Sequence, residues 1–174
     1  MRMKMLKSAW GIVLICAFLA GFLYMNNDIG ISRGGLEQDV RSSQKIPDDW
    51  NIDGDVSSTM AAFISYPQDK SDHTFSVYVN RPGISFGYFF RGGGDITAVE
   101  DFIAEFTVEG YQEQAFISMN TQNVERLEID DGNTVRIIHI DSNKPFAIVL
   151  PLNLGTLCFY DESGNLVEYL RQCL

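Results

Sequence analysis

Cysteine and histidine are scarce in this 174-residue chain, which contains three cysteines and two histidines. Three cysteines are too few for the disulfide framework that holds many small secreted domains together. Two histidines without a Cys-x-x-Cys pair give little support to a zinc site. The chain also lacks the Gly-x-Ser-x-Gly elbow and the active-site cysteine signatures of hydrolases. The sequence therefore offers no assembled catalytic or metal-binding motif.

Basic residues are also in short supply, because 13 Lys and Arg face 23 Asp and Glu and leave a net charge of −10. This balance excludes nucleic acid as a partner, since binding to phosphates needs a basic surface. Apolar residues make up 45% of the chain and charged residues 21%, which predicts a folded protein rather than a disordered one. The length predicts one domain of ordinary size.

The longest apolar run lies near the N-terminus, over residues 8–25, and follows Arg2, Lys4 and Lys7. Such a run is about as long as a helix needs to cross the hydrocarbon core of a bilayer. Basic residues before a span stay in the cytoplasm. The sequence therefore predicts a single-pass signal-anchor over residues 8–25, with the bilayer as its partner. The N-terminus is then cytoplasmic and the rest of the chain extracytoplasmic.

Two other interpretations of this run remain. A cleaved signal peptide would give a secreted protein, but it needs small residues at positions −3 and −1 of the cleavage site. Cleavage after Ala20 or Gly21 places Phe18 or Leu19 at −3. A lipoprotein would use Cys16, which lies in the middle of the run rather than at its end.

The composition changes from residue 26 to residue 52, where glycine, serine and mixed charges surround isolated apolar residues. Such a segment does not bury a core by itself, and we expect a flexible spacer. The chain thus divides into an anchor (1–25), a spacer (26–52) and a domain (53–174). Residues 1–25 hold three basic and no acidic side chains, so the remainder carries −10 − 3 = −13. That charge favours basic partners or cations.

The domain shows apolar residues in alternation, interrupted by turn signals every 8–12 residues. We expect an all-β, antiparallel β-sandwich-like fold of about 8–10 short strands. The candidate strands are 57–66, 73–80, 84–91, 101–108, 114–119, 123–130, 133–141, 145–150, 155–161 and 166–171. Residues 96–106 fit either a strand or a helix, and alternation up to Gly110 favours the strand. The run 146–150 is apolar throughout, which predicts a central strand that is covered on both faces.

The first predicted hairpin turns at Pro82-Gly83 with an even-numbered loop. Its register places three pairs of apolar residues on one buried face: Val79 with Phe86, Val77 with Tyr88, and Phe75 with Phe90. Tyr78 and Phe89 then flank Gly87 on the opposite face. If this face is exposed, the two aromatic side chains could stack on a sugar ring or bind a partner protein.

Two further hairpins are expected. Asp131-Gly132 marks the first of them, with Leu127, Ile129, Ile138 and Ile140 on one face and His139 on the other. The second turns at residues 162–165 and places Cys158 opposite Tyr169.

Three sets of residues are candidates for chemistry. His139 and Asp141 share a strand face and could serve an envelope hydrolase, although no nucleophile accompanies them. Asn51, Asp53 and Asp55 have the spacing of the first ligands of a calcium-binding loop, but the later ligands are absent. Cys158 and Cys173 could pair after export, if the last residues fold back to within disulfide reach.

These observations favour a membrane-anchored extracytoplasmic binding or interaction module rather than an enzyme. The partner is an envelope protein or a glycan that the sequence does not identify. An envelope hydrolase that uses His139 and Asp141 is the alternative, and carbohydrate binding through Tyr78 and Phe89 is a special case of the first interpretation. No cofactor is expected apart from calcium at Asn51, Asp53 and Asp55.

Overall fold

The computed structural model describes residues 2–25, 28–81 and 86–174, without the side chains of residues 2–9, 11, 23 and 24. The helices are α1 (Arg2–Met25), the 3-10 turn η1 (Arg33–Gly35), α2 (Leu36–Ser43) and α3 (Thr97–Glu100). The strands are β1 (Asn51–Val56), β2 (Met60–Tyr66), β3 (Thr74–Asn80), β4 (Tyr88–Gly94), β5 (Ile103–Thr107), β6 (Glu113–Ser118), β7 (Val124–Asp130), β8 (Val135–His139), β9 (Phe146–Pro151), β10 (Thr156–Asp161), β11 (Leu166–Val167) and β12 (Tyr169–Cys173).

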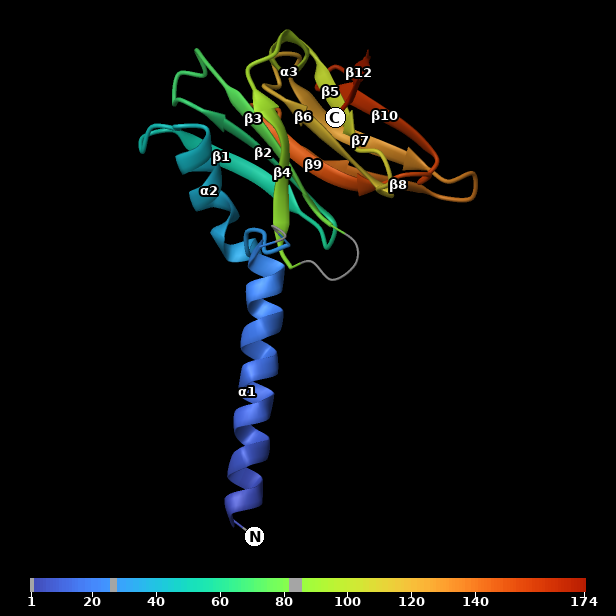
Figure 1. Cartoon of the computed structure of the whole chain (residues 1–174). Coiled ribbons are helices and arrows are strands. Elements are labelled where there is room, and N and C mark those ends of the chain that lie inside the picture. Colours follow the sequence, from blue (N-terminus) through green and yellow to red (C-terminus); the bar gives the residue numbers. More distant parts are fainter. Residues whose placement is uncertain (1, 26–27, 82–85) are drawn as a thin grey trace.

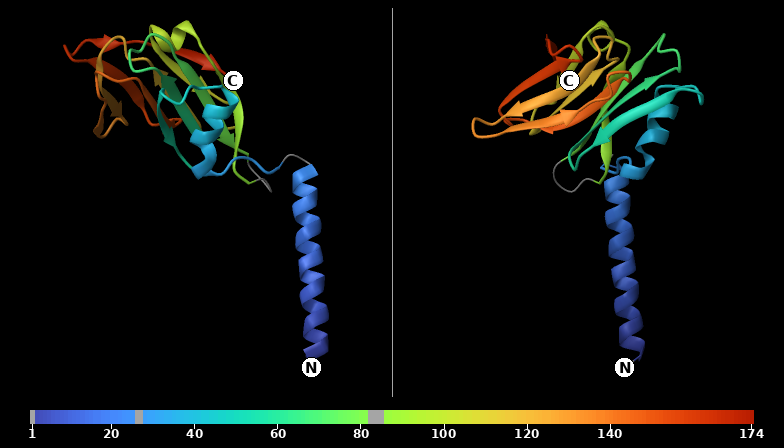
Figure 2. Two further views of the ribbon diagram at one scale, coloured as in Figure 1. Left: turned by 90° about the vertical axis from the view of Figure 1, so that its left-hand side faces the viewer. Right: turned by 180° about the vertical axis from the view of Figure 1, so that it is seen from behind.

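The strands form three four-stranded sheets that stack as layers (Figures 1 and 2). The first sheet has the order β1-β2-β3-β4, the central sheet β12-β5-β6-β9, and the third sheet β11-β10-β7-β8. Strand pairing is antiparallel except between β12 and β5, which run parallel. The expectation of an all-β domain built mainly from antiparallel sheets is confirmed.

The central sheet is buried on both faces, because each face packs against a different neighbour. Ala104 and Phe106 of β5 lie in a core shared with the first sheet. Ile103 of β5 and Phe116 of β6 lie in a second core, shared with the third sheet. The strand predicted over residues 146–150 is present as β9, and it contributes alternate residues to the two cores, but it lies at the edge of its sheet instead of at the predicted central position.

A third cluster of apolar side chains covers the outer face of the first sheet. Leu36 and Val40 of α2 point into it, one helical turn apart, and both are fully buried against that sheet. The Tyr78 hydroxyl donates a hydrogen bond to Asp39 of the same helix at 2.8 Å. The prediction of a flexible spacer is therefore wrong for this segment, because residues 36–43 form part of the folded domain.

Helix α1 projects from the domain (Figures 1 and 2), and its described apolar side chains are exposed. Counting only the residues whose side chains are described, which leaves out much of α1, no helix is both long enough and apolar enough to span a membrane.

All ten predicted strands have counterparts in the structure, and two details differ. β1 was missed, because its residues were assigned to the end of the spacer and to a calcium-binding loop. The last predicted strand is divided into β11 and β12, which belong to different sheets. Residues 96–106 hold both predicted elements in succession, since α3 is followed by β5.

The predicted register of the first hairpin is wrong. Val79 pairs with Phe89, and Val77 pairs with Gly92. The pairing of β3 with β4 is irregular between Val77 and Tyr78, where β4 contains one residue more than β3. The register before this point therefore differs by one residue from the register after it. The predicted Pro-Gly turn lies outside the described residues. An odd-numbered shift exchanges the faces of β4, so Tyr88 packs with α2 instead of the inner core.

The second hairpin keeps its predicted faces with a register shifted by two residues. Leu127 pairs with Ile138 and Ile129 with Arg136, because the loop has four residues, from Asp131 to Thr134. The Asp131 carboxylate accepts the backbone N–H groups of Asn133 and Thr134 and so stabilises this longer turn. An even-numbered shift leaves each side chain on its face. Leu127 and Ile129 lie in the core, and Ile138 and Ile140 pack against it from the same predicted face.

The predicted register of the third hairpin is wrong by one residue, since Phe159 pairs with Val167, and Tyr169 lies opposite Ile103 of β5 instead of Cys158. The hairpin is also shorter than predicted, because the chain leaves it after two residues of β11. β12 then joins the central sheet beside β5, with Arg171 opposite Glu105. Arg171 donates a hydrogen bond to the buried Glu105 carboxylate at 3.0 Å. Cys158 therefore lies in the third sheet and Cys173 in the central sheet. Both are free thiols, so the disulfide that the sequence allowed between them is not formed in the structure.

We predict that Leu36→Ala destabilises the domain by about 2–4 kcal/mol, because it removes a buried side chain between α2 and the first sheet. The exposed Gln38 on the same helix gives the matched control, and Gln38→Ala should change stability by less than about 0.5 kcal/mol. Urea unfolding of both variants measures the difference. Equal stabilities would show that α2 is not docked as described.

Candidate functional site

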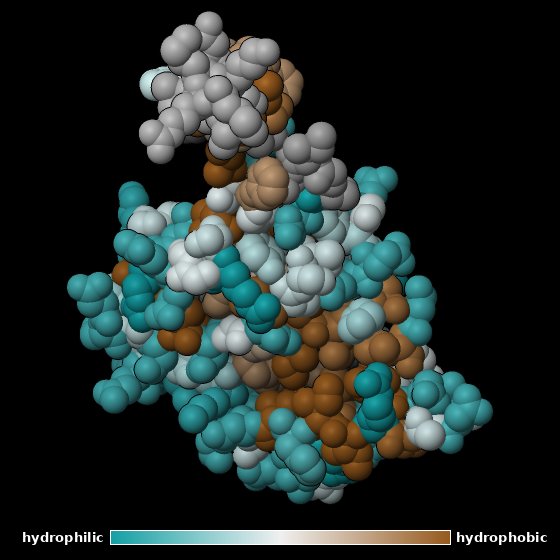
Figure 3. Space-filling view, turned by 90° about the horizontal axis from the view of Figure 1, so that it is seen from below, coloured by the Kyte–Doolittle hydropathy of each residue, from teal (hydrophilic) through white to brown (hydrophobic). Residues whose placement is uncertain are grey.

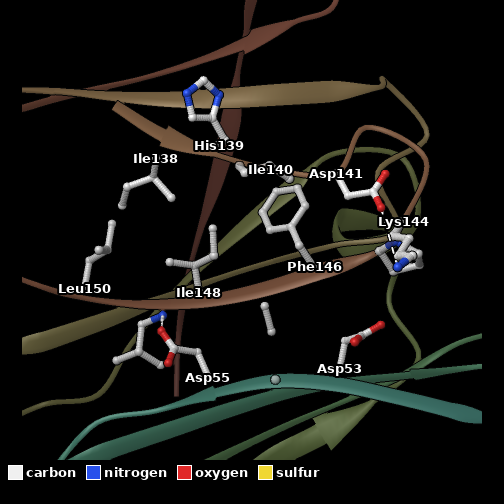
Figure 4. Close-up of a pocket in the computed structure, with 14 residues that line it drawn as sticks. Asp53, Asp55, Ile138, His139, Ile140, Asp141, Lys144, Phe146, Ile148 and Leu150 are labelled. Atoms are coloured by element: carbon white, nitrogen blue, oxygen red, sulfur yellow. Dashed lines mark hydrogen bonds and ion pairs between the residues drawn. The ribbon is translucent and has the colours of Figure 1, made fainter. Parts of the chain in front are cut away.

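An open groove of about 500 Å³ runs along β9, where the three sheets end on the same side of the domain. β1, β9 and β8 are the edge strands of the first, central and third sheets on that side, and all three line the groove. β9 lies between β1 and β8 and forms the floor (Figure 4). The groove therefore comes from the layering of the sheets rather than from one loop.

The wall next to the third sheet is apolar. Ile138 and Ile140 come from β8 and the residue that follows it, and Phe146, Ile148 and Leu150 are the alternate residues of β9 that face them (Figure 4). The same side chains belong to the core between the central and third sheets, which here remains open to solvent. In a view from below, apolar residues gather on the underside of the domain within polar surroundings (Figure 3).

The opposite wall is acidic and comes from β1. Asp53 and Asp55 are two residues apart on this strand, so their side chains share a face and point toward β9 (Figure 4). Asp53 accepts a hydrogen bond of 2.5 Å from the Tyr66 hydroxyl of the neighbouring strand β2. Asp55 accepts the backbone N–H of Val149 at 3.0 Å, which ties the edge of the first sheet to the floor of the groove.

The segment between β8 and β9 adds a second group of charged residues. His139 is exposed at the end of β8, and Asp141 forms an ion pair with Lys144 at 3.5 Å. His139 and Asp141 both line the groove, but they do not share a strand face: the His139 side chain points to the opposite side of β8 from Ile138 (Figure 4), and Asp141 lies beyond the end of this strand. The described lining residues include no serine, threonine, tyrosine or cysteine. A nucleophile of the kind that a hydrolytic triad needs is therefore not found beside this histidine in the described part of the groove.

The predicted calcium ligands lie on a strand instead of a loop. Asn51, Asp53 and Asp55 share one face of β1, and the two carboxylates already have protein partners in Tyr66 and Val149. Within the described ranges, no group of three or more His, Cys, Asp or Glu side chains is arranged to hold a metal ion. Calcium binding here stays a prediction from the sequence, without the curved loop that an EF-hand uses.

The predicted pair of exposed aromatic residues does not exist. Tyr78 is fully buried beneath α2, and its ring contacts Phe63 and Phe90 edge-on. Phe89 pairs with Val79 and so faces the other side of the first sheet, where its ring stacks under Arg81. The error follows from the register of the first hairpin, because the shift separates the two aromatic residues onto opposite faces.

Sequence reasoning missed the floor of the groove, although it identified four of the charged or titratable residues that line it. It assigned Asp53 and Asp55 to calcium binding and His139 and Asp141 to hydrolysis, and all four line one groove in the structure. The apolar run of β9 was the one signal for this floor in the sequence. It indicates a buried strand, but the position of that strand at a sheet edge depends on pairing between residues far apart in the chain. No family model, curated protein or solved structure matches the chain.

The Tyr66 hydroxyl gives this wall of the groove a measurable pH dependence. Burial raises the pKa of Tyr66 above its usual value of about 10, and the hydrogen bond to Asp53 adds to the shift. An unfolded chain therefore loses this proton at a lower pH than the folded domain. The stabilisation is complete below about pH 10 and is lost as the pH rises further.

We predict that Tyr66→Phe reduces the alkaline loss of stability. Urea unfolding over a series from about pH 8 to pH 11 should show a smaller decline for the variant than for the unchanged protein, since phenylalanine has no proton to lose. A decline of the same steepness in both proteins would show that Tyr66 does not titrate as described.

Proposed function

We propose that the chain is a membrane-anchored binding module whose ligand site is the groove along β9. The groove itself carries this proposal. Its volume of about 500 Å³, its largely apolar lining and its few charged side chains match the usual composition of a ligand site. A binding role is favoured over hydrolysis because His139 and Asp141 lack a hydroxyl or thiol among the described lining residues.

The exposed side chains of α1 support the anchor. Ile12, Val13, Leu14 and Ile15 follow one another and so point around the whole helix, at about 100° per residue. Each of the four is more than half exposed, and Phe18 and Phe22 are exposed as well. Large apolar side chains on every face are unfavourable in water and suit the interior of a bilayer. The apolar sequence continues from Ser8 to Met25, and basic residues precede it.

The domain begins almost directly after the helix. The backbone carbonyl of Asp28 accepts the Phe86 N–H, and Ile31 and Tyr88 exchange two hydrogen bonds across the edge of β4. Only two residues separate Met25 from Asp28. In this proposal the N-terminus is cytoplasmic and the domain lies close to the outer surface of the membrane, instead of at the end of a long spacer. Secretion after cleavage of the apolar segment is the alternative.

We predict that the full chain sediments with membranes and that Val13→Lys with Leu14→Lys releases it. Each charge at the centre of a span costs about 2.5–3.5 kcal/mol on insertion scales. Val13→Leu with Leu14→Val keeps the apolar composition and serves as the control. An extracytoplasmic phosphatase fused after Leu174 should be active in the control and inactive in the lysine variant. A full-length control protein in the soluble fraction would contradict the anchor.

We predict that the groove binds the uncharged apolar dye N-phenyl-1-naphthylamine and that Ile138→Lys reduces this binding at least fivefold, because the ammonium group disrupts the apolar wall. Ile137 precedes Ile138 on β8 but lies on the outer face, more than half exposed, so Ile137→Lys adds the same charge outside the groove. Dye fluorescence measures the affinity, and circular dichroism confirms that both variants fold. Equal effects of the two substitutions would show that the dye binds elsewhere.

A further inference from the structure

The floor of the groove is an unpaired strand edge. β9 pairs with β6 on one side, and within the described chain its other side pairs with no strand. Backbone groups of an antiparallel strand point alternately to its two sides. Because the Val149 N–H points to Asp55 and away from β6, Ala147 also directs its N–H and C=O into the groove.

The two ends of this edge are blocked against additional pairing. Pro145 and Pro151 flank it, and neither has an N–H to donate. Asp55 already occupies the N–H of Val149. These features limit indiscriminate sheet extension, which is the usual risk of an exposed edge. The backbone groups that remain free to pair are the N–H and C=O of Ala147 and the C=O of Val149. An added strand can form hydrogen bonds with these three groups in one register.

The walls determine which side chains an added strand can carry. Side chains of a strand alternate between its faces, so one set would lie against Ile138, Ile140 and Ile148. The other set would lie against Asp53 and Asp55, next to a chain whose residues after position 25 carry a charge of −13. Apolar residues fit the first wall and basic residues fit the second.

We propose that the groove receives an extended polypeptide segment of a partner protein, with alternating apolar and basic residues, which adds to β9 as a strand. This inference rests on the proposed function, because it names the class of ligand for the same groove. Backbone hydrogen bonds to β9 supply affinity, and the two unlike walls supply specificity. The acidic wall also distinguishes this ligand from an anionic lipid, which it repels.

The test uses the full chain in phosphatidylcholine nanodiscs and a fluorescent peptide of about seven residues, long enough to span β9. The peptide alternates isoleucine and lysine, and a second peptide alternates isoleucine and glutamate. We expect the lysine peptide to bind at least tenfold more tightly. Its affinity should fall as salt rises from about 0.05 to 0.5 M, because screening weakens the attraction to the acidic wall.

Two N-methylated peptides test strand addition without changing the protein. One carries methyl groups on the backbone nitrogens of all isoleucines and the other on those of all lysines. The N–H groups of alternate residues point to opposite sides of a strand, so only one set can face β9. We expect one methylated peptide to lose at least tenfold in affinity and the other to bind nearly normally. Similar binding of both peptides would overturn strand addition.

Asp53→Asn tests the acidic wall. The amide oxygen can still accept the Tyr66 hydroxyl, so the variant removes charge with little change in structure. We expect lysine-peptide binding to weaken about two- to fivefold at low salt, as for an exposed ion pair. Asp101→Asn neutralises an exposed carboxylate outside the groove and should leave binding unchanged. Equal effects of the two variants would contradict a role for the acidic wall.

The outcomes separate this inference from the proposed function. Dye binding that depends on Ile138, without binding of either peptide, overturns strand addition and keeps the groove as a ligand site. Phosphatidylcholine that stays bound to the protein and excludes the peptide identifies a lipid site and also overturns the inference. Absence of dye and peptide binding contradicts both proposals.

Discussion

The fold depends on a central sheet that meets water on neither face. Its strands must therefore be apolar on both sides, and β5 and β6 place alternate residues in two separate cores. The main exception is Glu105, a buried carboxylate that Arg171 of β12 contacts at 3.0 Å. A buried charge without a partner is strongly destabilising, so this pair fixes β12 beside β5 and completes the sheet. The three sheets thereby enclose two cores, one on each face of the central sheet.

The same layering creates the groove. Stacked sheets cover each other's faces, but they leave their edges open unless a loop or helix lies across them. On the side of β1, β9 and β8 the central edge forms a floor and the outer sheets form walls of different chemistry. The hydrogen bond from Val149 to Asp55 and the flanking prolines keep this edge from extending freely. An apolar core that remains open beside a protected strand edge can hold a ligand without a dedicated loop.

Local sequence patterns were sufficient to predict most strands of the domain. They did not predict the register of the first hairpin or the site, because both depend on pairing between residues far apart in the chain. Alternation identified β2, β3 and the buried faces of β7 and β8, since an even-numbered shift in register leaves those faces unchanged. The pairing of Asn80 with Tyr88 sets an odd-numbered shift at the start of β4 and so reversed its predicted faces there, and no local signal in the sequence reveals this length of the connection. Helix α2 was missed because only Leu36 and Val40 mark its buried side within a glycine- and serine-rich segment. The site was predictable only in part, because the edges of three sheets meet there.

The attachment of the helix leaves the groove accessible. Residues 28–31 pair with the start of β4, which is the edge of the first sheet opposite to β1. In the view from below, polar surface lies between the projecting helix and the apolar patch on the underside of the domain (Figure 3). Under the proposed anchoring, the groove would lie near the membrane surface, and the described residues leave it open. In that proposal the acidic wall of β1 disfavours anionic headgroups and favours a basic segment that reaches the groove from another protein.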